Sequence, residues 1–319
     1  MNRTPVTRDP NAARRARRVG GGIVVCAAVL AAGGLVVAAA ITSAAPVVAT
    51  ASPIAPVTST TAADPDDSDD LVPIEPATRL ISAFDAKTAW RTTIGDCSDD
   101  DVVVERSVDG GGTWDGFNLG SAGGITGAIA LQALGDDNSA TVIGQNTTGC
   151  TPTWVETTSA GTSWTAYSDR TATAWYVDTT SLSLIHTPGA VVRPAPCDVA
   201  GLASLSSTSA AVLCTDRSLH RTVDGGLTWT TSKTVPAALA VGASTDGYLV
   251  ASQSRDVSCT GLTIWGLPES PTTDPATVSS CVPTASSTGE VALSGTSEAL
   301  WLWAGTVVLR SLDEGATWR

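Results

Sequence analysis

The sequence predicts an all-β protein: a β-propeller of about five four-stranded blades, six being the next choice, preceded by one transmembrane helix and a disordered linker. Three observations carry this prediction. An eight-residue turn motif that ends in Trp recurs along the chain, and pairs of short apolar runs recur at intervals of roughly 40–50 residues, as in propellers. The aromatic residues are dominated by 10 Trp, against 3 Tyr and 2 Phe. This bias indicates a structural use for Trp.

The first predicted elements are a basic cytoplasmic tail over residues 1–18 and a transmembrane helix over residues 19–41. The second segment has no charged residue and no Pro, and as a helix it is long enough to cross a hydrocarbon core of ~30 Å. Because the Arg residues precede it, the positive-inside rule places the N-terminus in the cytoplasm. The sequence therefore predicts a single-pass protein of the cell membrane with an extracytoplasmic propeller. The alternative is a cleaved signal peptide and a secreted protein.

Residues 42–70 are predicted to form a Pro/Ala/Thr-rich linker that ends in an acidic cluster between Asp64 and Asp70. The cluster lacks the central Gly and the closing Glu of a calcium-binding loop. It is typical of a solvated spacer whose like charges repel one another. No metal site is predicted here.

The composition excludes several classes of function. The chain has a net charge of −13 and only 2 His, and its basic residues are almost all Arg. The composition therefore argues against a histidine-rich metal site, a Schiff-base lysine enzyme and a basic nucleic-acid binder. The sequence predicts no cofactor, no metal and no nucleic-acid partner.

Residues 71–319 are predicted to form the propeller, and the turn motif organises them. In each good copy the Asp accepts amide hydrogens of the turn, the Gly tolerates positive φ and the Trp packs back on the sheet. A fourth, worn copy has Ser159 in place of Asp. The residues expected to build these turns are Ser107, Asp109, Gly111 and Trp114; Gly161 and Trp164; Asp224, Gly226 and Trp229; and Asp313, Gly315 and Trp318.

A strand-turn-strand pair precedes each motif, and five such units can be counted. The fourth unit has lost its motif and keeps only the strand Leu262–Gly266. The chain stops at Arg319, where the outermost strand of the last blade should begin. We expect Leu71–Pro76 to supply that strand and so close the ring without an exposed edge.

Six of the seven Cys lie outside the predicted membrane span. An even number of Cys in an exported domain favours disulfides, although six permit many connectivities and some could remain free. Cys197 and Cys214 flank a predicted hairpin, so antiparallel pairing brings them face to face. Cys259 and Cys281 flank the outer strands of the fourth unit. The third predicted pair is Cys97 with Cys150.

The turn motifs resemble the Asp-box, or bacterial neuraminidase repeat, Ser-x-Asp-x-Gly-x-Thr-Trp, across residues 80–319. The whole architecture resembles uncharacterised actinobacterial membrane-anchored propeller proteins. The resemblance implies that the box is a structural turn on the propeller rim, so Asp109, Asp224 and Asp313 are assigned to structure. It implies no single function, because Asp-box propellers include sialidases, other glycosidases, sorting receptors and photosystem II assembly factors.

No catalytic residue is predicted. Sialidases resemble one another in an Arg-Ile-Pro motif, an Arg triad, a Tyr–Glu pair and an Asp acid, but Arg-Ile-Pro does not occur in this sequence. Tyr167, Tyr176 and Tyr248 have no recognisable nucleophile context, and there is no Gly-x-Ser-x-Gly elbow. Paired carboxylates need no local signature, so glycoside hydrolysis stays open.

The segment between Trp164 and Leu202 is much longer than the repeat requires. Insertions on propellers map to loops, and loops carry binding. This interpretation makes it a candidate binding site. The alternative is a degenerate sixth blade or a structural outer strand. The candidate binding residues are Trp175, Tyr176, His186 and Arg193.

The predicted function is a non-catalytic binding or assembly module with an unknown extracytoplasmic protein or carbohydrate ligand. The alternatives are a sialidase-like glycoside hydrolase and a photosystem II assembly-factor-like chaperone. A catalytic propeller should bring Arg, Tyr and acidic side chains together at one mouth of its central channel. A binding module should have a polar mouth without that set.

Overall fold

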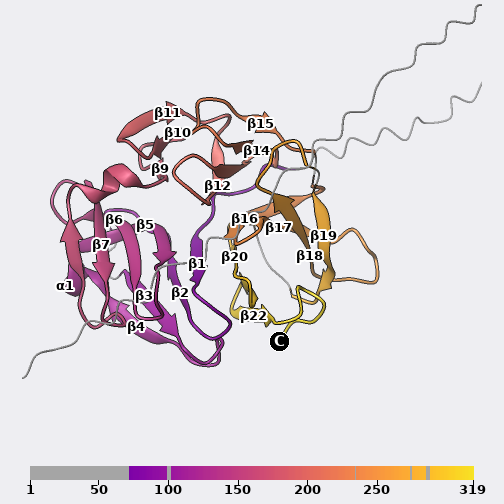
Figure 1. The fold of residues 1–319 in the computed structure, drawn as a ribbon, viewed down its shortest axis with the longest axis horizontal. Coiled ribbons are helices and arrows are strands. Elements are labelled where there is room, and N and C mark those ends of the chain that lie inside the picture. Colours follow the sequence, from indigo (N-terminus) through magenta and orange to yellow (C-terminus); the bar gives the residue numbers. More distant parts are fainter. Residues whose placement is uncertain (1–71, 99–101, 234, 274, 285–287) are drawn as a thin grey trace, which may run out of the picture. The chain divides into compact units, whose positions relative to one another are not determined.

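The computed structural model describes residues 72–98, 102–233, 235–273, 275–284 and 288–319, which form six antiparallel sheets arranged in a ring (Figure 1). We number the sheets as blades 1–6 in chain order. Six blades correct the prediction of five. The additional blade is the long segment after Trp164, whose turns lack the motif and so do not reveal it in the sequence.

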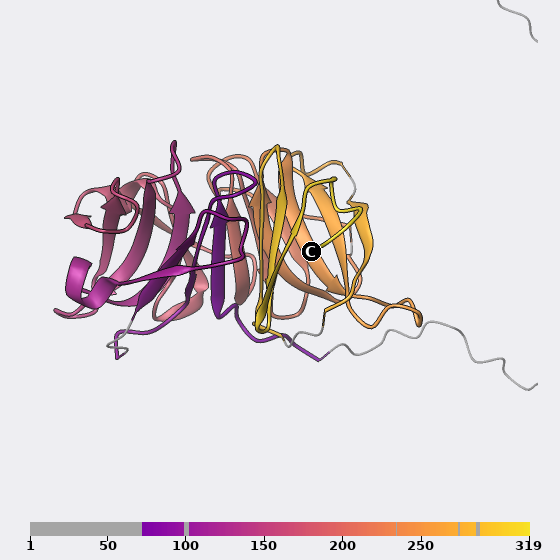
Figure 2. The same cartoon turned by 90° about the horizontal axis from the view of Figure 1, so that it is seen from below.

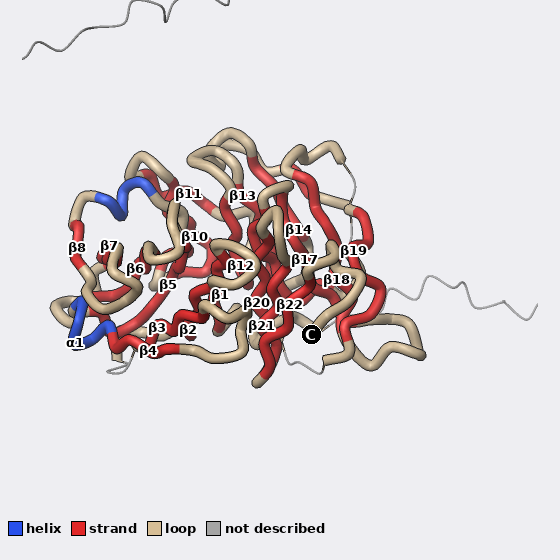
Figure 3. The backbone as a smooth tube through the Cα atoms, turned by 60° about the horizontal axis from the view of Figure 1, so that its bottom comes forward, coloured by secondary structure: helices blue, strands red, loops and turns tan. Residues whose placement is uncertain are grey.

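The first three blades contain eleven strands. Blade 1 consists of β1 (Arg79–Ala83), β2 (Ala89–Thr93), β3 (Val103–Ser107) and β4 (Asp115–Asn118). The short helix α1 (Leu119–Gly123) leads to blade 2, with β5 (Ile125–Ala133), β6 (Ala140–Asn146), β7 (Pro152–Thr157) and β8 (Thr165–Tyr167). The 3-10 helix η1 (Arg170–Thr173) leads to blade 3, with β9 (Tyr176–Asp178), β10 (Ser181–Thr187) and β11 (Val191–Pro194). Figure 3 shows both helices in blue.

The other three blades follow the same order from the centre outwards. Blade 4 consists of β12 (Val199–Ser204), β13 (Ala210–Cys214), β14 (Leu219–Thr222) and β15 (Thr230–Thr231). Blade 5 consists of β16 (Ala238–Ser244), β17 (Gly247–Gln253), β18 (Leu262–Pro268) and β19 (Ala276–Val282). Blade 6 consists of β20 (Val291–Gly295), β21 (Leu300–Ala304) and β22 (Val307–Ser311).

The second strands of the blades are the most buried elements of the ring. All five residues of β13 are buried, as are the first six residues of β17. Both faces of these strands meet a neighbouring blade, so their sequences are continuous apolar runs rather than alternating ones. The outer strands β4 and β15 are short and largely exposed.

The ring has two faces, between which the strands run (Figure 2). In the four-stranded blades, the turns between the first and second strands share one face with the turns between the third and fourth, because successive strands are antiparallel. We call this the turn face. The opposite face carries the connections from one blade to the next, and we call it the connection face.

The predicted closure of the ring is wrong. Blade 6 has three strands, and residues 72–76 form no strand beside it. Instead, the amide of Ile74 donates to Thr215 O at 2.8 Å, and that of Ala77 donates to Ala200 O at 2.7 Å, both in blade 4. Ile74 is buried in the cluster that blades 4, 5 and 6 share, so this side chain packs into the core instead of forming an outer strand of blade 6.

Three disulfides are present, and they are the three pairs that the sequence predicted. Cys97–Cys150 joins a loop of blade 1 to a loop of blade 2, with a Cα–Cα distance of 5.4 Å. Cys197–Cys214 and Cys259–Cys281 have Cα–Cα distances of 5.8 and 5.7 Å. All three distances lie in the normal range for disulfides.

No helix among the described residues is long and apolar enough to cross a membrane. The predicted tail over residues 1–18, the span over residues 19–41 and the linker over residues 42–70 lie outside the described residues. The predicted single-pass localisation in the cell membrane is corrected accordingly and is not carried further.

Four turns, which we call the box turns, have the motif sequence: residues 107–114, 157–164, 222–229 and 311–318. In the first, Thr113 donates its amide to Asp109 Oδ1 at 2.9 Å and its hydroxyl to Asp109 Oδ2 at 2.8 Å. The amide of Gly111 donates to Ser107 Oγ at 2.8 Å. In the worn copy, Ser159 Oγ takes the place of the carboxylate and accepts from the amide of Ser163 at 3.0 Å.

Each box turn packs against the preceding blade, which explains its Gly. Gly111, Gly161 and Gly315 all have φ near +90°, a region that other residues rarely adopt. A Cβ at Gly161 would lie 2.5 Å from the Phe117 ring of blade 1, and one at Gly315 would lie 2.6 Å from Val278 of blade 5. The turns therefore contribute to the contacts between blades.

The box turns are expected to make the protein sensitive to acid. The Thr113 amide, the Thr113 hydroxyl and the Ser107 hydroxyl lower the pKa of Asp109 from 3.8 to about 2. Equivalent bonds lower the pKa values of Asp224 and Asp313 to about 2. Because these folded-state values lie below the unfolded value, the stabilisation is complete above about pH 4 and is lost as the pH falls towards 2.

Equilibrium denaturation at constant ionic strength between pH 4 and pH 2 measures this loss. Replacing all three aspartates by Asn should flatten the fall in the free energy of unfolding over this range. The worn turn with Ser159 has no carboxylate to titrate and needs no substitution. An equally steep fall in the triple variant would show that other carboxylates are responsible.

Candidate functional site

The innermost strand of blade 3 runs in the opposite direction to the innermost strands of the other blades. Trp175, just before β9, donates its Nε1 to Ser206 O at 2.9 Å in the turn between β12 and β13, so β9 starts at the turn face. The innermost strands of the four-stranded blades end at that face. After β11, Cys197 is bonded to Cys214, which ends β13 at the connection face. The directions of β9, β10 and β11 thus match the second, third and fourth strands of a full blade. No described strand of blade 3 corresponds to the first, innermost strand of a full blade.

The seam between blades 2 and 3 has no apolar core within the described residues. The hydrophobic clusters connect blade 1 with blade 2, blade 6 with blade 1, blade 3 with blade 4, and blades 4, 5 and 6 with one another. Blade 3 also has no box turn that could pack on blade 2. Blades 2 and 3 are therefore joined less tightly than the other neighbours.

A cavity of about 770 Å³ occupies the centre of the ring and extends into this seam. From blades 1, 4, 5 and 6 it is lined mainly by innermost strands, whose residues there are mostly Ala, Ser, Gly and aliphatic side chains. In blade 2 the lining reaches the second and third strands, through Thr141, Ile143, Gln145 and Trp154. The missing innermost strand of blade 3 explains why these side chains face open space.

Three residues of the cavity wall are largely buried, but their polar side-chain atoms are open to the cavity and make no hydrogen bond to the described residues. They are Thr141, 3% exposed, Gln145, 7% exposed, and Tyr176, 7% exposed. A hydroxyl, an amide and a phenol that converge without partners on one cavity are typical of a ligand site.

Blade 3 holds Tyr176 in a fixed position. The Tyr176 ring stacks on His186 with centroids 4.2 Å apart and planes 9° apart. His186 Nε2 lies 2.8 Å from Asp178 Oδ2, and burial together with the Asp178 charge raises the pKa of Tyr176. Burial opposes ionisation of Asp178, but hydrogen bonds from Thr180 and His186 outweigh it and lower the pKa of Asp178. The phenol is therefore neutral and the carboxylate ionised near pH 7.

The four predicted binding residues all belong to blade 3 or the residue just before it, but only Trp175 and Tyr176 line the cavity. His186 stacks on Tyr176 without lining the cavity. Trp175 packs edge-to-face on Trp229 of blade 4, with centroids 6.4 Å apart. Arg193 lies against the box turn of blade 4, where its Cδ would be 3.4 Å from a Cβ at Gly226. The segment is thus the sixth blade that the sequence left as an alternative, and part of it lines the cavity.

Sequence reasoning missed Thr141, Gln145 and Trp154. The sequence does contain one sign that these three side chains face a cavity: the identity of the residue just before each turn motif. This residue is Arg106, Arg221 or Arg310 in the good copies but Glu156 in the worn copy of blade 2. Each of these Arg side chains hydrogen-bonds the next blade. Glu156 instead pairs with Arg170, in the connection that leads to blade 3.

Among the described residues that line the cavity, only Arg79, Asp96 and Asp178 carry charge. Arg79 is engaged by Gly305 O, by Glu290 at 3.6 Å and by the Trp303 ring at 4.7 Å. The hydroxyl and the amide of Ser98 lower the pKa of Asp96. An Arg triad does not converge on the cavity within the described residues.

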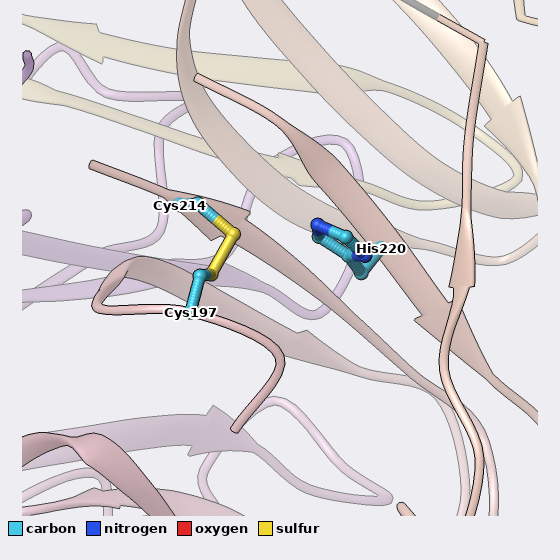
Figure 4. Close-up of side chains that lie close together, drawn as sticks. All are labelled: Cys197, Cys214 and His220. Carbon is cyan, nitrogen blue, oxygen red and sulfur yellow. A yellow bond between two sulfur atoms is a disulfide. The ribbon is translucent and has the colours of Figure 1, made fainter. Parts of the chain in front are cut away.

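Cys197, Cys214 and His220 lie close enough together to resemble a metal site, with their ligand atoms within 4.8 Å of one another (Figure 4). The two sulfur atoms form a disulfide and are not thiolates, which are the form that binds metal. The ring nitrogens of His220 contact Ser218 Oγ at 3.0 Å and Thr231 Oγ1 at 3.3 Å. These residues do not fit a metal in this state.

Neither a scan of protein-family models nor a search of curated proteins found a match. Among solved structures, YCF48 bound to a D1 peptide is 17% identical, with 77% of this chain and 81% of that chain covered and a TM-score of 0.41. A variant of AofleA from Arthrobotrys oligospora is 11% identical, with 78% and 86% covered and a TM-score of 0.43. The GH74 enzyme of Niastella koreensis is 14% identical, with 75% and 40% covered and a TM-score of 0.31. These similarities concern the fold alone.

Proposed function

We propose that this propeller is a non-catalytic binding module whose ligand occupies the cavity between the ring centre and the seam of blades 2 and 3. The observation that carries the proposal is that Thr141, Gln145 and Tyr176 line one cavity with polar side-chain atoms that make no hydrogen bond to the described residues. The volume of about 770 Å³ lies within the usual range for small-molecule sites.

The acidic groups of the cavity favour binding over glycoside hydrolysis. Glycosidases need a carboxylic acid with a raised pKa beside a second carboxylate. The two carboxyl groups in the described lining, Asp96 and Asp178, both have lowered pKa values. Neither is suited to donate a proton to a leaving group near neutral pH, and Arg79 alone does not make the Arg clasp of a sialidase.

We assign the box turns to structure rather than to the site. Their Asp side chains are satisfied within the turns, and their Gly residues pack on the preceding blade. The three disulfides favour an oxidising environment as the place where the protein works.

Two measurements on the full chain test the proposal. Incubation with 4-methylumbelliferyl sialoside and β-glucoside should release no fluorophore above a heat-denatured blank. In a thermal-shift panel of neutral saccharides, sialic acid and short peptides, at least one class should raise the melting temperature by binding the native state. Release of the fluorophore, or a panel without any binder, would overturn the proposal.

A blocking variant localises the binding. Leu182 lines the cavity and is 40% exposed, so Leu182→Trp should narrow the cavity with little loss of core packing. Val307→Trp is the matched control, because Val307 is 42% exposed on β22 and does not line the cavity. The thermal shift should disappear in the first variant and persist in the second. A shift that survives Leu182→Trp would place the site elsewhere.

A further inference from the structure

We infer, on the basis of the proposed function, that the ligand is a neutral saccharide whose ring lies in the seam between blades 2 and 3, with Trp154 against its apolar face. The seam is the only part of the described cavity where an aromatic platform, a second aromatic wall and unpartnered polar groups occur together. Trp154 belongs to blade 2 and Tyr176 to blade 3.

The unpartnered groups match the hydrogen-bonding pattern of sugar hydroxyls. Thr141 and Tyr176 offer hydroxyls, and Gln145 offers an amide with two donors and one acceptor. All three are uncharged, and each can donate as well as accept. A sugar hydroxyl does the same, so each of these side chains can pair with a hydroxyl of a saccharide. A cation would leave the donors unsatisfied, and an anion would leave the acceptors unsatisfied.

The two aromatic walls are held in place before a ligand arrives. Trp154 stands across from Ile143 in the pairing of β6 with β7, and its Nε1 donates to Glu156 Oε2 at 3.4 Å. On the other wall, Tyr176 is held by the stack on His186, which Asp178 orients. A preorganised wall reduces the entropy lost on binding, and a flat aromatic face fits the C–H face of a pyranose.

The charges around the seam favour a neutral ligand. Glu156 is paired with Arg170, and Asp178 is hydrogen-bonded to His186 and Thr180. No cation in the described lining of the seam is free to receive a sugar carboxylate, and the chain carries a net charge of −13. The mean field of the protein therefore opposes the approach of acidic saccharides.

Saturation-transfer NMR and calorimetry with the full chain test this inference. The probes are D-glucose, D-galactose, D-mannose and their β-linked disaccharides, with N-acetylneuraminic acid, glucosamine and a mixed tetrapeptide pool for comparison. At least one neutral sugar should bind. Trp154→Ala and Gln145→Leu should each weaken it roughly ten-fold, as expected from the loss of one aromatic contact or one buried hydrogen-bonding group.

Trp265→Ala is the matched control for Trp154→Ala. Trp265 also lies on the third strand of its blade and is half-buried, but it does not line the cavity. Its substitution should leave sugar affinity unchanged. Should Trp154→Ala fail to fold, Gln145→Leu still tests the seam, because Leu has a similar volume.

The outcomes separate this inference from the proposed function. Binding of peptides, sialic acid or glucosamine with no binding of neutral sugars would overturn the saccharide inference and leave the binding module intact. Equal losses of sugar affinity in Trp154→Ala and Trp265→Ala, with full affinity in Gln145→Leu, would also overturn it. A protein that binds none of the probes would contradict both.

Discussion

Trp301→Ala is expected to lower the free energy of unfolding by about 3–5 kcal/mol, the usual cost of emptying a buried Trp site. Trp301 is 0% exposed and lies in the seam between blades 6 and 1, where the ring closes. Its Nε1 donates to Asp85 O at 3.0 Å. The substitution therefore removes both a large apolar side chain and a hydrogen bond to the neighbouring blade. Equilibrium denaturation in urea measures the loss.

Trp301→Phe is the control that separates the two contributions. Phe keeps most of the apolar volume but cannot donate to Asp85 O, so about 1–2 kcal/mol should be lost. Both variants should keep the far-UV circular dichroism of the parent protein at low denaturant. A loss below about 1 kcal/mol for Trp301→Ala would mean that this seam collapses around the cavity.

The closing seam depends on side-chain and loop contacts because no described strand is shared between the first and last blades. The amide of Ala83 donates to Ser294 Oγ at 3.0 Å, and Arg310 donates to Ala86 O. The amide of Thr78 donates to Gly289 O at 2.8 Å. These bonds and the Trp301 cluster take the place of a shared strand. Trp301 is therefore a sensitive point for the whole ring.

The parts of the fold that were predictable are those that local chemistry determines. The box turns repeat because Asp109 and its equivalents satisfy their own turns, so the pattern is visible at short range. The Cys197–Cys214 pair follows from the register of one hairpin, in which Val199 pairs with Cys214. Such features need no knowledge of distant contacts.

The rest depended on contacts between distant residues. The direction of blade 3 is visible only when Trp175 is seen against Ser206 and Cys197 against Cys214. Trp154 looks like any Trp of an outer strand until the missing innermost strand of blade 3 uncovers it. The sequence pointed to Trp175 and Tyr176, but as part of an insertion rather than one wall of a cavity. It also could not show that Ile74 packs into the cluster that blades 4, 5 and 6 share.

Arg221→Met is expected to lower the free energy of unfolding by roughly 3 kcal/mol or more. Arg221 is 1% exposed on β14 of blade 4, and its guanidinium donates to Pro268 O, Ser270 O, Pro271 O and Thr273 O of blade 5. Hydrogen bonds to a charged group contribute roughly 1.5–3 kcal/mol each. The expected loss is smaller than the sum of four such bonds because we expect two of the four carbonyls to turn towards water and bond to it instead. Met keeps the apolar stem and removes every donor.

The large effect follows from the loss of the box turn in blade 5. Blades 1, 2, 4 and 6 each pack a box turn on the preceding blade, whereas the loop after β18 has no motif and is held by Arg221 instead.

Arg221→Lys should recover only part of the stability, because one ammonium cannot reach carbonyls that a planar guanidinium spans. Arg106→Met is the matched control: Arg106 also precedes a motif, but its hydrogen bonds to blade 2 go only to Asp137 O and Asn138 Oδ1, beside a 4.0 Å ion pair with Asp137 and the Trp90 ring at 5.6 Å. It should lose about 1 kcal/mol. Equal losses in Arg221→Met and Arg106→Met by urea denaturation, or unchanged hydrogen exchange in residues 269–273 of Arg221→Met, would show that the loop keeps its place without the guanidinium.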